Sequence, residues 1–278
     1  MLEILIVILI IAGISLLGML LWRVLGGAAR SRFRAGVRGA VVCLAAAVLV
    51  LPFVWNFSKS RHLQLFGGLV TRVETAEPVV ALTFDDGPAA GYTGEILQIL
   101  AGGGVRATFF VTGKELAAHP AEGRQLAVAG HELGNHSFSH RRMLGMNYST
   151  VREEIEQTDK LIRATGYTGT INFRPPYGKR FIVLPCYLKT HQRRTIFWDI
   201  EPESYQEVAR DSDALSAYIM ERVQPGSIIL LHVMAASREV TRAALPGIIA
   251  GLQERGYRFE TVSRLLGYAE SGYEFENR

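Results

Sequence analysis

Two long stretches without a charged residue constrain this chain more than any other feature of its sequence. Residues 4–22 and 39–57 each run for 19 residues without Asp, Glu, Lys or Arg. An α-helix rises about 1.5 Å per residue, so each stretch would extend roughly 28 Å, close to the hydrocarbon thickness of a bilayer. The sequence therefore predicts a transmembrane hairpin (1–58), a linker (59–74), one folded domain (75–270) and a tail (271–278).

Other structures for these two stretches are less consistent with the sequence. A cleavable signal peptide fits the first stretch poorly, because Glu3 rather than a basic segment precedes it. Its apolar part is also longer than the usual apolar region of a signal peptide, about 7 to 15 residues. A hairpin buried inside a soluble core is the remaining alternative, and we favour the membrane hairpin over it.

The connection between the two stretches, residues 23–38, is rich in positive charge. Its five arginines are Arg23, Arg30, Arg32, Arg34 and Arg38. Because positively charged connections stay in the cytoplasm, we expect the domain to lie on the extracytoplasmic (periplasmic) side of the inner cell membrane. Much of the formal net charge of +4 comes from this connection. No basic stripe interleaved with aromatic residues follows it, so the charge does not indicate nucleic-acid binding.

The rest of the chain alternates short apolar runs with helical periodicity. The runs predicted to be strands are 79–84, 107–111, 195–198, 227–232 and 257–261. Helices are predicted over 211–223, over 241–254, and from a capping box of Thr150 and Glu153 to near Gly166. Alternation over about 200 residues predicts an α/β fold with a parallel sheet, either open or closed.

Two adjacent carboxylates follow the first of these strands, in the segment Thr83-Phe84-Asp85-Asp86-Gly87-Pro88. Successive side chains on a strand point to opposite faces, so the strand must end there if both carboxylates are to reach one pocket. Two carboxylates in one pocket repel each other, and a bound cation is the simplest compensation. The alternative is an ordinary strand followed by a capped turn.

Two histidines stand four residues apart in His136-Ser137-Phe138-Ser139-His140. Residues at i and i+4 share one face of a helical turn, so both rings could reach one ion, and a carboxylate from elsewhere could complete the set of ligands. A pair of exposed histidines on a helix is the alternative. Together with the double aspartate, the pair favours a metal site.

Five blocks along the domain carry a family resemblance. Four of them are Thr83-Phe84-Asp85-Asp86-Gly87, His136-Ser137-Phe138-Ser139-His140, Arg174-Pro175-Pro176-Tyr177-Gly178 and Ile228-Ile229-Leu230-Leu231-His232. In order and composition they resemble the polysaccharide deacetylase family, also known as the NodB homology domain or carbohydrate esterase family 4. The resemblance covers about residues 75–270. It implies a distorted, incomplete (β/α) barrel with its chemistry at the C-terminal ends of the strands.

The resemblance also implies a site for a divalent metal ion. Asp86, His136 and His140 would hold the ion, which we expect to be Zn²⁺, with Co²⁺, Ni²⁺ and Mn²⁺ as alternatives. The ion would lower the pKa of a water molecule and polarise an amide carbonyl.

The remaining roles that the resemblance implies concern proton transfer and substrate binding. Asp85 would be the general base, and Arg174 would keep it ionised and oriented. His232 would be the general acid that protonates the departing amine. The backbone N–H of Tyr177 would stabilise the oxyanion. The other residues expected at the substrate site are Pro176, Leu230 and Trp198.

The fourth block departs from the family pattern. This chain reads Glu201-Pro202-Glu203-Ser204-Tyr205, with Ser204 and Tyr205 where the family has Asp and Trp. The resemblance implies that this Asp supports the general acid by its charge and that the Trp forms one wall of the sugar groove. Asp199, Glu201 or Glu203 could replace the charge. Trp198 or Tyr205 could supply the aromatic wall.

Three functions are consistent with the sequence. The first is a membrane-anchored deacetylase that hydrolyses the N-acetyl amide of amino sugars in an extracytoplasmic glycan and releases acetate. The second is a deformylase or deacetylase of a lipid-linked amino sugar, in keeping with the two membrane helices. The third is a non-catalytic glycan-binding scaffold with the same fold. Intact Asp85, Asp86, His136 and His140 argue against the third.

Overall fold

The computed structural model describes residues 60–276 together with Gly36, Ala40, Leu44 and Val48. The chain divides into two compact units, Met1–Phe57 and Ser58–Arg278, and every strand of the described residues belongs to the second unit.

The predicted membrane-spanning helices, 4–22 and 39–57, lie outside the described residues except at Ala40, Leu44 and Val48. Across the part of the chain that the structure describes, no helix has both the length and the apolar character needed to cross a bilayer.

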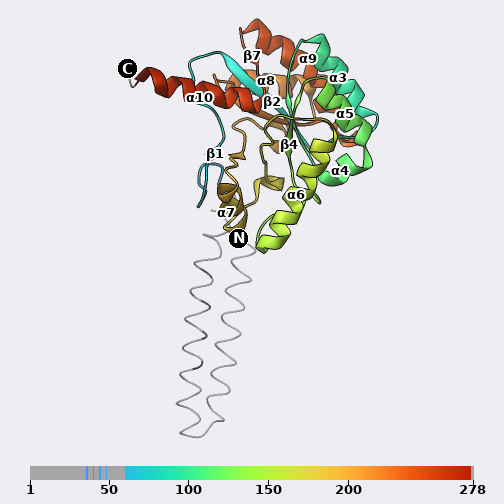
Figure 1. Cartoon of the computed structure of the whole chain (residues 1–278). Coiled ribbons are helices and arrows are strands. Elements are labelled where there is room, and N and C mark those ends of the chain that lie inside the picture. The colour runs from blue at the N-terminus through green and yellow to red at the C-terminus, as the bar shows by residue number, and fades with distance from the viewer. Residues whose placement is uncertain (1–35, 37–39, 41–43, 45–47, 49–59, 277–278) are drawn as a thin grey trace, which may run out of the picture. The chain divides into compact units, whose positions relative to one another are not determined.

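Parallel strands form the centre of the domain (Figure 1). They are β1 (Leu69–Val70), β2 (Val79–Asp85), β3 (Thr108–Val111), β4 (Glu132–Asn135), β5 (Thr195–Ile196), β6 (Ile228–His232) and β7 (Arg258–Phe259). Strands β4, β3, β2 and β6 pair in that order, β7 pairs with the first residues of β2, and β1 pairs with β5. Single bridges join Phe173 to β4 and β5, and Ile200 to β6. These bridges link the two groups of strands into a distorted β/α barrel, as the resemblance implies.

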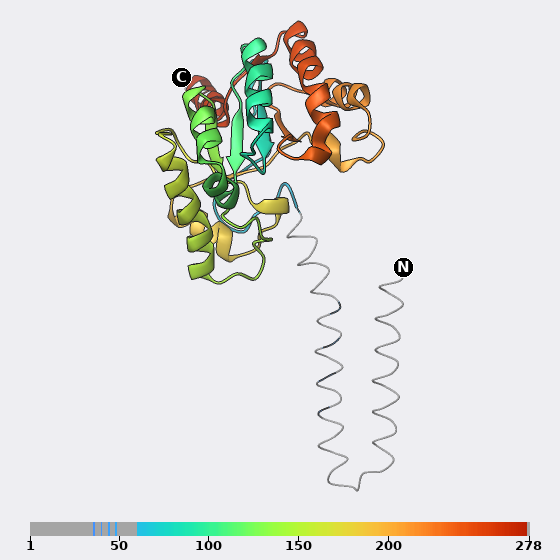
Figure 2. The same ribbon diagram turned by 90° about the vertical axis from the view of Figure 1, so that its right-hand side faces the viewer.

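The helices surround the strands (Figures 1 and 2). They are α3 (Tyr92–Gly102), α4 (Gly113–Ala118), α5 (Pro120–Val128), α6 (Tyr148–Ala164), α7 (Val183–Thr190), α8 (Ser212–Arg222), α9 (Glu239–Glu254) and α10 (Val262–Glu276). The described residues also form three short 3-10 helices, η1 (Pro176–Gly178), η2 (Pro202–Ser204) and η3 (Ala236–Arg238). Each comes shortly after a strand or after a residue that forms a single β-bridge. All three carry residues that line the site, among them Tyr177 of η1, Ser204 of η2 and Arg238 of η3.

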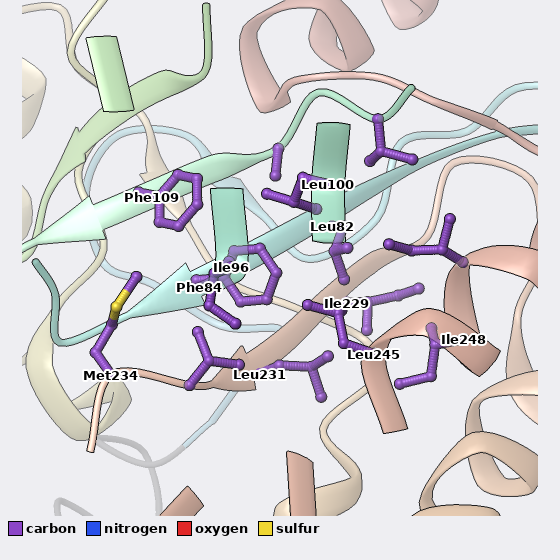
Figure 3. Packing of buried hydrophobic residues seen from close by; sticks show 14 of the residues in the cluster. Leu82, Phe84, Ile96, Leu100, Phe109, Ile229, Leu231, Met234, Leu245 and Ile248 are labelled. Carbon is purple, nitrogen blue, oxygen red and sulfur yellow. The ribbon is translucent and has the colours of Figure 1, made fainter. Parts of the chain in front are cut away.

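The side chains of β2 alternate between two cores. Its even-numbered residues, from Val80 to Phe84, point outward and pack with side chains of α3 and α9 (Figure 3). Its odd-numbered residues point into the barrel and end with Asp85, which is 2% exposed. The two-residue period of a strand therefore places this carboxylate inside the barrel, at the C-terminal end of the strand.

The structure contains all five predicted strands, as β2, β3, β5, β6 and β7. Strand β4 was not predicted, because Glu132-Leu133-Gly134-Asn135 is not an apolar run. The predicted capping box at the start of α6 is wrong. The helix begins at Tyr148, and the Asn147 side chain caps it by accepting a hydrogen bond from the Thr150 backbone N–H (2.9 Å).

Part of the segment predicted as a linker packs on the domain. Strand β1 pairs with β5, and the backbone N–H of Val73 donates to the carbonyl oxygen of Gly226 at 2.9 Å. The side chain of Arg61 reaches Glu201, at a distance of 2.5 Å. This segment therefore contributes to one side of the site.

Candidate active site

The candidate site lies where the parallel strands end. Asp85 is the last residue of β2, and His232 is the last residue of β6. The two stand directly opposite each other in the parallel ladder, and His136 follows β4 at the same end of the sheet. Ladder register thus brings together side chains that are far apart in the sequence.

Asp85 forms a buried ion pair with Arg174. The Nη1 atom of Arg174 donates to Asp85 Oδ1 at 2.7 Å and to Thr83 Oγ1 at 2.9 Å. Its Nη2 and Nε atoms donate to the carbonyl oxygens of Phe197 and Ile196. Burial lowers the pKa of Arg174, and the charge of Asp85 opposes that shift. The guanidinium group is therefore fixed in position, and it fixes the carboxylate in turn.

Asp86 points away from this pair, toward the two histidines. Its Oδ1 atom lies 3.1 Å from His140 Nε2 and 3.7 Å from His136 Nε2. Although 43% of the Asp86 side chain is exposed, Oδ1 itself is buried and has no hydrogen-bond partner. Burial raises the pKa of Asp86, but His140, His136 and His232 outweigh it and hold that pKa below its usual range.

The two imidazoles are oriented as ligands for an ion. The Nδ1–H group of His136 donates to the carbonyl oxygen of Arg174 at 2.7 Å, which leaves the lone pair of Nε2 pointing into the site. Burial lowers the pKa of His136 and so favours the neutral ring. One ligand atom from each of Asp86, His136 and His140 lies within 4.8 Å of the other two. One carboxylate oxygen and two imidazole nitrogens suit Zn²⁺ and similar divalent ions. The orphaned Oδ1 atom fits such a site.

The prediction that the two histidines share a helical turn is wrong. They belong to an irregular loop after β4, with positive φ angles of 65° at Ser137 and 56° at His140. Their ring centroids are nevertheless 5.0 Å apart. The loop is fixed by Glu154 of α6, which accepts hydrogen bonds from the backbone N–H groups of Phe138 and Ser139.

Glu154 is not predicted as a site residue from the sequence, although the chain carries a signal for it. Val151, Ile155 and Thr158 define the buried face of α6, and Glu154 lies on that face. A carboxylate on the apolar face of an amphipathic helix requires polar partners. Here those partners are the loop that carries the histidines.

Left-handed backbone conformations concentrate at the site. Among the described residues, five that are not glycine have a positive φ angle, and four of them are Asp86, Ser137, His140 and Tyr177. Such conformations cost of order 1–3 kcal/mol each and persist where the surrounding structure enforces them. Their concentration here indicates that packing holds the site in a geometry that the local sequence disfavours.

Close packing around the histidine loop leads to a first prediction, on the variant Gly113→Ala. A Cβ atom at Gly113 would lie 2.4 Å from Phe138 Cδ2 and 2.6 Å from Thr158 Oγ1. We expect the variant to lose about 1–3 kcal/mol of stability, because overpacking forces the neighbours to move. Divalent metal affinity should fall with it, since Phe138 lies between the two histidines. Thermal unfolding and metal titration of the full chain measure the two effects.

The control for this prediction is Gly94→Ala in α3, where the added Cβ atom meets nothing within 4 Å. Replacing a helical glycine there should leave metal affinity unchanged and raise stability by about 0.5–1 kcal/mol. Equal metal affinity in the Gly113→Ala and unmutated chains would contradict the proposed packing of the loop.

Glu203 is the partner of His232. Its Oε2 atom accepts a hydrogen bond from His232 Nδ1 at 2.5 Å and one from the His232 backbone N–H at 3.0 Å. Its Oε1 atom accepts from Thr241 Oγ1 at 2.7 Å. Burial alone lowers the pKa of His232, but the hydrogen bond and charge of Glu203 outweigh it and raise the pKa to about 9.

The other two candidates for the missing acidic group have different partners. Asp199 accepts hydrogen bonds from Ser227 Oγ and from the backbone N–H of Ile228. Glu201 accepts from Trp198 Nε1 at 2.9 Å. Of the three carboxylates that the sequence left open, Glu203 is therefore the one that the structure brings to His232.

A pocket of about 510 Å³ lies over these groups. Its lining includes Asp85, Asp86, His136, His140, Tyr177, Trp198, Ser204, Leu230 and His232. Pro176 is buried and is not among the lining residues, and Tyr205 instead packs against Tyr218, with ring centroids 5.2 Å apart. Trp198, rather than Tyr205, thus lines the pocket, together with the exposed ring of Tyr177.

Comparison with known proteins identifies relatives of this chain. The family described as polysaccharide deacetylase matches residues 72–193. A peptidoglycan-N-acetylglucosamine deacetylase of Bacillus cereus is 31% identical over 212 residues, which cover 75% of this chain and 97% of that protein.

Solved structures give the same result for the fold. A peptidoglycan N-acetylglucosamine deacetylase superposes with a TM-score of 0.66 and 29% identity, over 71% of this chain and 92% of that one. A CE4 family pseudoenzyme from Bacillus anthracis superposes with a TM-score of 0.63 and 27% identity, over 71% of this chain and 68% of that one. The shared fold thus includes both an enzyme and a protein described as a pseudoenzyme.

Proposed function

Because this chain belongs to the polysaccharide deacetylase family, we propose that it is a metal-dependent N-deacetylase of an extracytoplasmic glycan, anchored in the inner membrane by its N-terminal hairpin. One observation carries the proposal. The donor set of Asp86, His136 and His140 faces the same pocket as Asp85, which is held by Arg174, and His232, which is held by Glu203. A divalent ion bound there, in our proposal Zn²⁺, supplies Lewis-acid chemistry that activates water and polarises the amide carbonyl.

The protein groups divide the proton transfers between them. Asp85 accepts a proton from the attacking water, and Arg174 keeps this carboxylate ionised and aimed. The water oxygen bonds to the acetyl carbon, and the bond from that carbon to the sugar nitrogen breaks. His232 donates its proton to the departing nitrogen, so the products are acetate and an amino sugar. The 3.9 Å between His232 Nε2 and Asp86 Oδ2 places the acid beside the proposed metal ligand.

The aromatic lining of the pocket supports a sugar substrate. Tyr177 is 53% exposed, its ring centroid lies 4.7 Å from that of His140, and the Arg142 guanidinium lies over it at 4.6 Å; Trp198 lines the same pocket. Aromatic rings with part of their surface exposed can pack against the apolar faces of pyranose rings. N-acetylated glycans such as peptidoglycan are the substrate class that we propose.

The test of this function is acetate release by the full-length chain from N-acetylated oligosaccharides. We expect release that a chelator abolishes and that added Zn²⁺ or Co²⁺ restores. Metal content is measured on the same preparation. A chain that binds glycan and releases no acetate with any divalent ion added would instead be the non-catalytic scaffold.

Membrane anchoring and orientation need a separate experiment. We expect the full-length chain to stay with the membrane after a carbonate wash. In spheroplasts, external protease should degrade the domain and spare the segment 1–58. Protection of the domain from protease would contradict the proposed periplasmic location.

The pairing of Glu203 with His232 leads to a prediction on the pH dependence of turnover. A general acid works when protonated, so kcat/KM should fall on the alkaline side as pH rises through the pKa of His232, which is raised to about 9. Glu203→Gln removes the negative charge that raises the pKa of His232, while the burial that lowers this pKa remains. The alkaline limb should therefore move about 1–3 pH units lower.

The matched control for Glu203→Gln is Glu201→Gln. Glu201 lines the same pocket, but its carboxylate contacts Arg61 and Trp198 rather than His232. Its removal should leave the alkaline limb in place. An alkaline limb that is the same in Glu203→Gln and in the unmutated chain would exclude Glu203 as the group that holds the proton on His232.

A further inference from the structure

Exposed apolar side chains gather beside the pocket. Four of them come from two short segments: Leu63 is 59% exposed, Leu65 46%, Phe66 38% and Ile182 45%. We call these four residues the apolar rim. Other exposed large apolar side chains, such as Val128 on α5, come from separate elements of the described chain. An exposed cluster of this kind marks a surface that contacts something other than water.

The two segments of the apolar rim are fastened together by Arg180. Its Nη2 atom donates to the carbonyl oxygens of Ser60 and Leu63, at 2.8 and 2.9 Å. Its Nε atom donates to Gln64 Oε1 at 3.0 Å. Arg180 is 2% exposed and its guanidinium group lies 4.2 Å from the centre of the Phe197 ring. The rim is therefore a fixed part of the domain surface.

The same two segments form one side of the pocket. Arg61 and Lys179 both line it. The guanidinium group of Arg61 lies over the Trp198 ring at 5.1 Å and pairs with Glu201. The apolar rim and the pocket mouth are thus adjacent, and two cationic residues lie between them.

The place of these segments in the chain indicates what covers the rim. The second uncharged stretch ends at residue 57, three residues before Ser60. Three residues extend at most about 11 Å, so a span that ends at residue 57 keeps Ser60 near the headgroup layer. Apolar side chains flanked by Arg and Lys are typical of surfaces that lie in the membrane interface.

We propose that the apolar rim rests on the lipid surface of the bilayer that anchors this chain, so that the catalytic pocket opens at that surface. This inference rests on the membrane anchoring and the deacetylase activity of the proposed function. It favours, among the possible substrates, an N-acetylated amino sugar that is attached to a lipid. Such a sugar reaches the pocket without leaving the membrane.

The first test measures contact with lipid directly. The full-length chain, with Cys43→Ala and Cys186→Ala, receives Leu63→Cys, Ile182→Cys or Val128→Cys and an environment-sensitive fluorophore. It is placed in nanodiscs of phosphatidylethanolamine and phosphatidylglycerol. We expect lipids with a quencher near the headgroup to quench the label at positions 63 and 182. The control label at position 128, where Val128 is 86% exposed, should not respond.

Two results of this test would overturn the inference. One is equal quenching at all three positions. The other is a label at position 63 that is shielded from water and not quenched by lipid, because a second copy of the chain or another protein would then cover the rim.

The second test compares substrates. In the triple variant Leu63→Gln, Phe66→Gln, Ile182→Gln, we expect kcat/KM to fall about tenfold for a lipid-linked N-acetylated sugar in vesicles, because contact with the bilayer is lost. For a soluble chitooligosaccharide the change should stay below about twofold, since none of the three residues lines the pocket. Equal losses on both substrates would overturn the inference. If the unmutated chain releases acetate from neither substrate, the proposed deacetylase function fails. The fluorescence-quenching experiment then tests by itself whether the apolar rim contacts lipid.

Discussion

Asp85→Asn is expected to abolish turnover while the metal site stays intact. The substitution removes the carboxylate that accepts the proton of water, and loss of a general base lowers turnover by about 10²–10⁴-fold. The proposed ligand atoms belong to Asp86, His136 and His140, so the variant should bind one divalent ion per chain. Acetate release and metal content are measured on the same preparation.

The substitution can keep one contact of the native carboxylate and changes another, because Asp85 Oδ2 lies 3.5 Å from His136 Nε2. The amide oxygen of Asn can accept the hydrogen bond that Asp85 Oδ1 accepts from Arg174 Nη1. The change in shape is therefore small, although the guanidinium group loses its counter-charge. Retention of more than about a tenth of the turnover would remove Asp85 from the role of general base.

His136→Ala is expected to remove both the metal and the activity. The ring is buried and oriented by the carbonyl oxygen of Arg174, and its Nε2 atom is one of the three ligand atoms of the proposed site. Loss of a residue that merely orients a ligand lowers metal affinity about 10- to 100-fold, and loss of the ligand itself should cost more than that. Isothermal titration with Zn²⁺ gives the affinity, and acetate release gives the activity.

The matched control is His131→Ala, which also removes a buried histidine. The His131 ring packs edge-on against Phe109, and its Nδ1 atom accepts from the backbone N–H of Ala107. Burial lowers its pKa to about 4, consistent with a neutral structural ring. This variant should be less stable and still bind metal. Unchanged zinc affinity in His136→Ala would refute the proposed ligand set.

The sequence predicts the fold well where one local pattern decides the structure. The apolar run before Asp85 is a strand, and it ends there as predicted. The convergence of both aspartates on one pocket is also confirmed, because Asp86 has a φ angle of 75° that turns it toward the histidines. Strand β4 is not predicted because its sequence is not an apolar run. Its polar residues are stabilised by distant partners, among them Ser263, which donates to Glu132.

The sequence is a weaker guide where the result depends on distant packing. The spacing of His136 and His140 correctly brings the rings together, yet the helical turn that it suggests is replaced by a loop braced by Glu154. The choice among Asp199, Glu201 and Glu203 depends on how η2 packs beside β6, and no local pattern in the sequence encodes that. Tertiary contacts decide both features.

The position of Glu203 bears on how activity is assigned across this family. The chain has Ser204 where the pattern that it resembles has Asp, so a comparison that scores that single position would find no acidic residue there. In space, the carboxylate of Glu203 reaches His232 from the residue before. Searches that ask which acidic atom lies beside the terminal histidine, rather than which letter stands at one column, would find a carboxylate that is shifted by one residue, as it is in this chain.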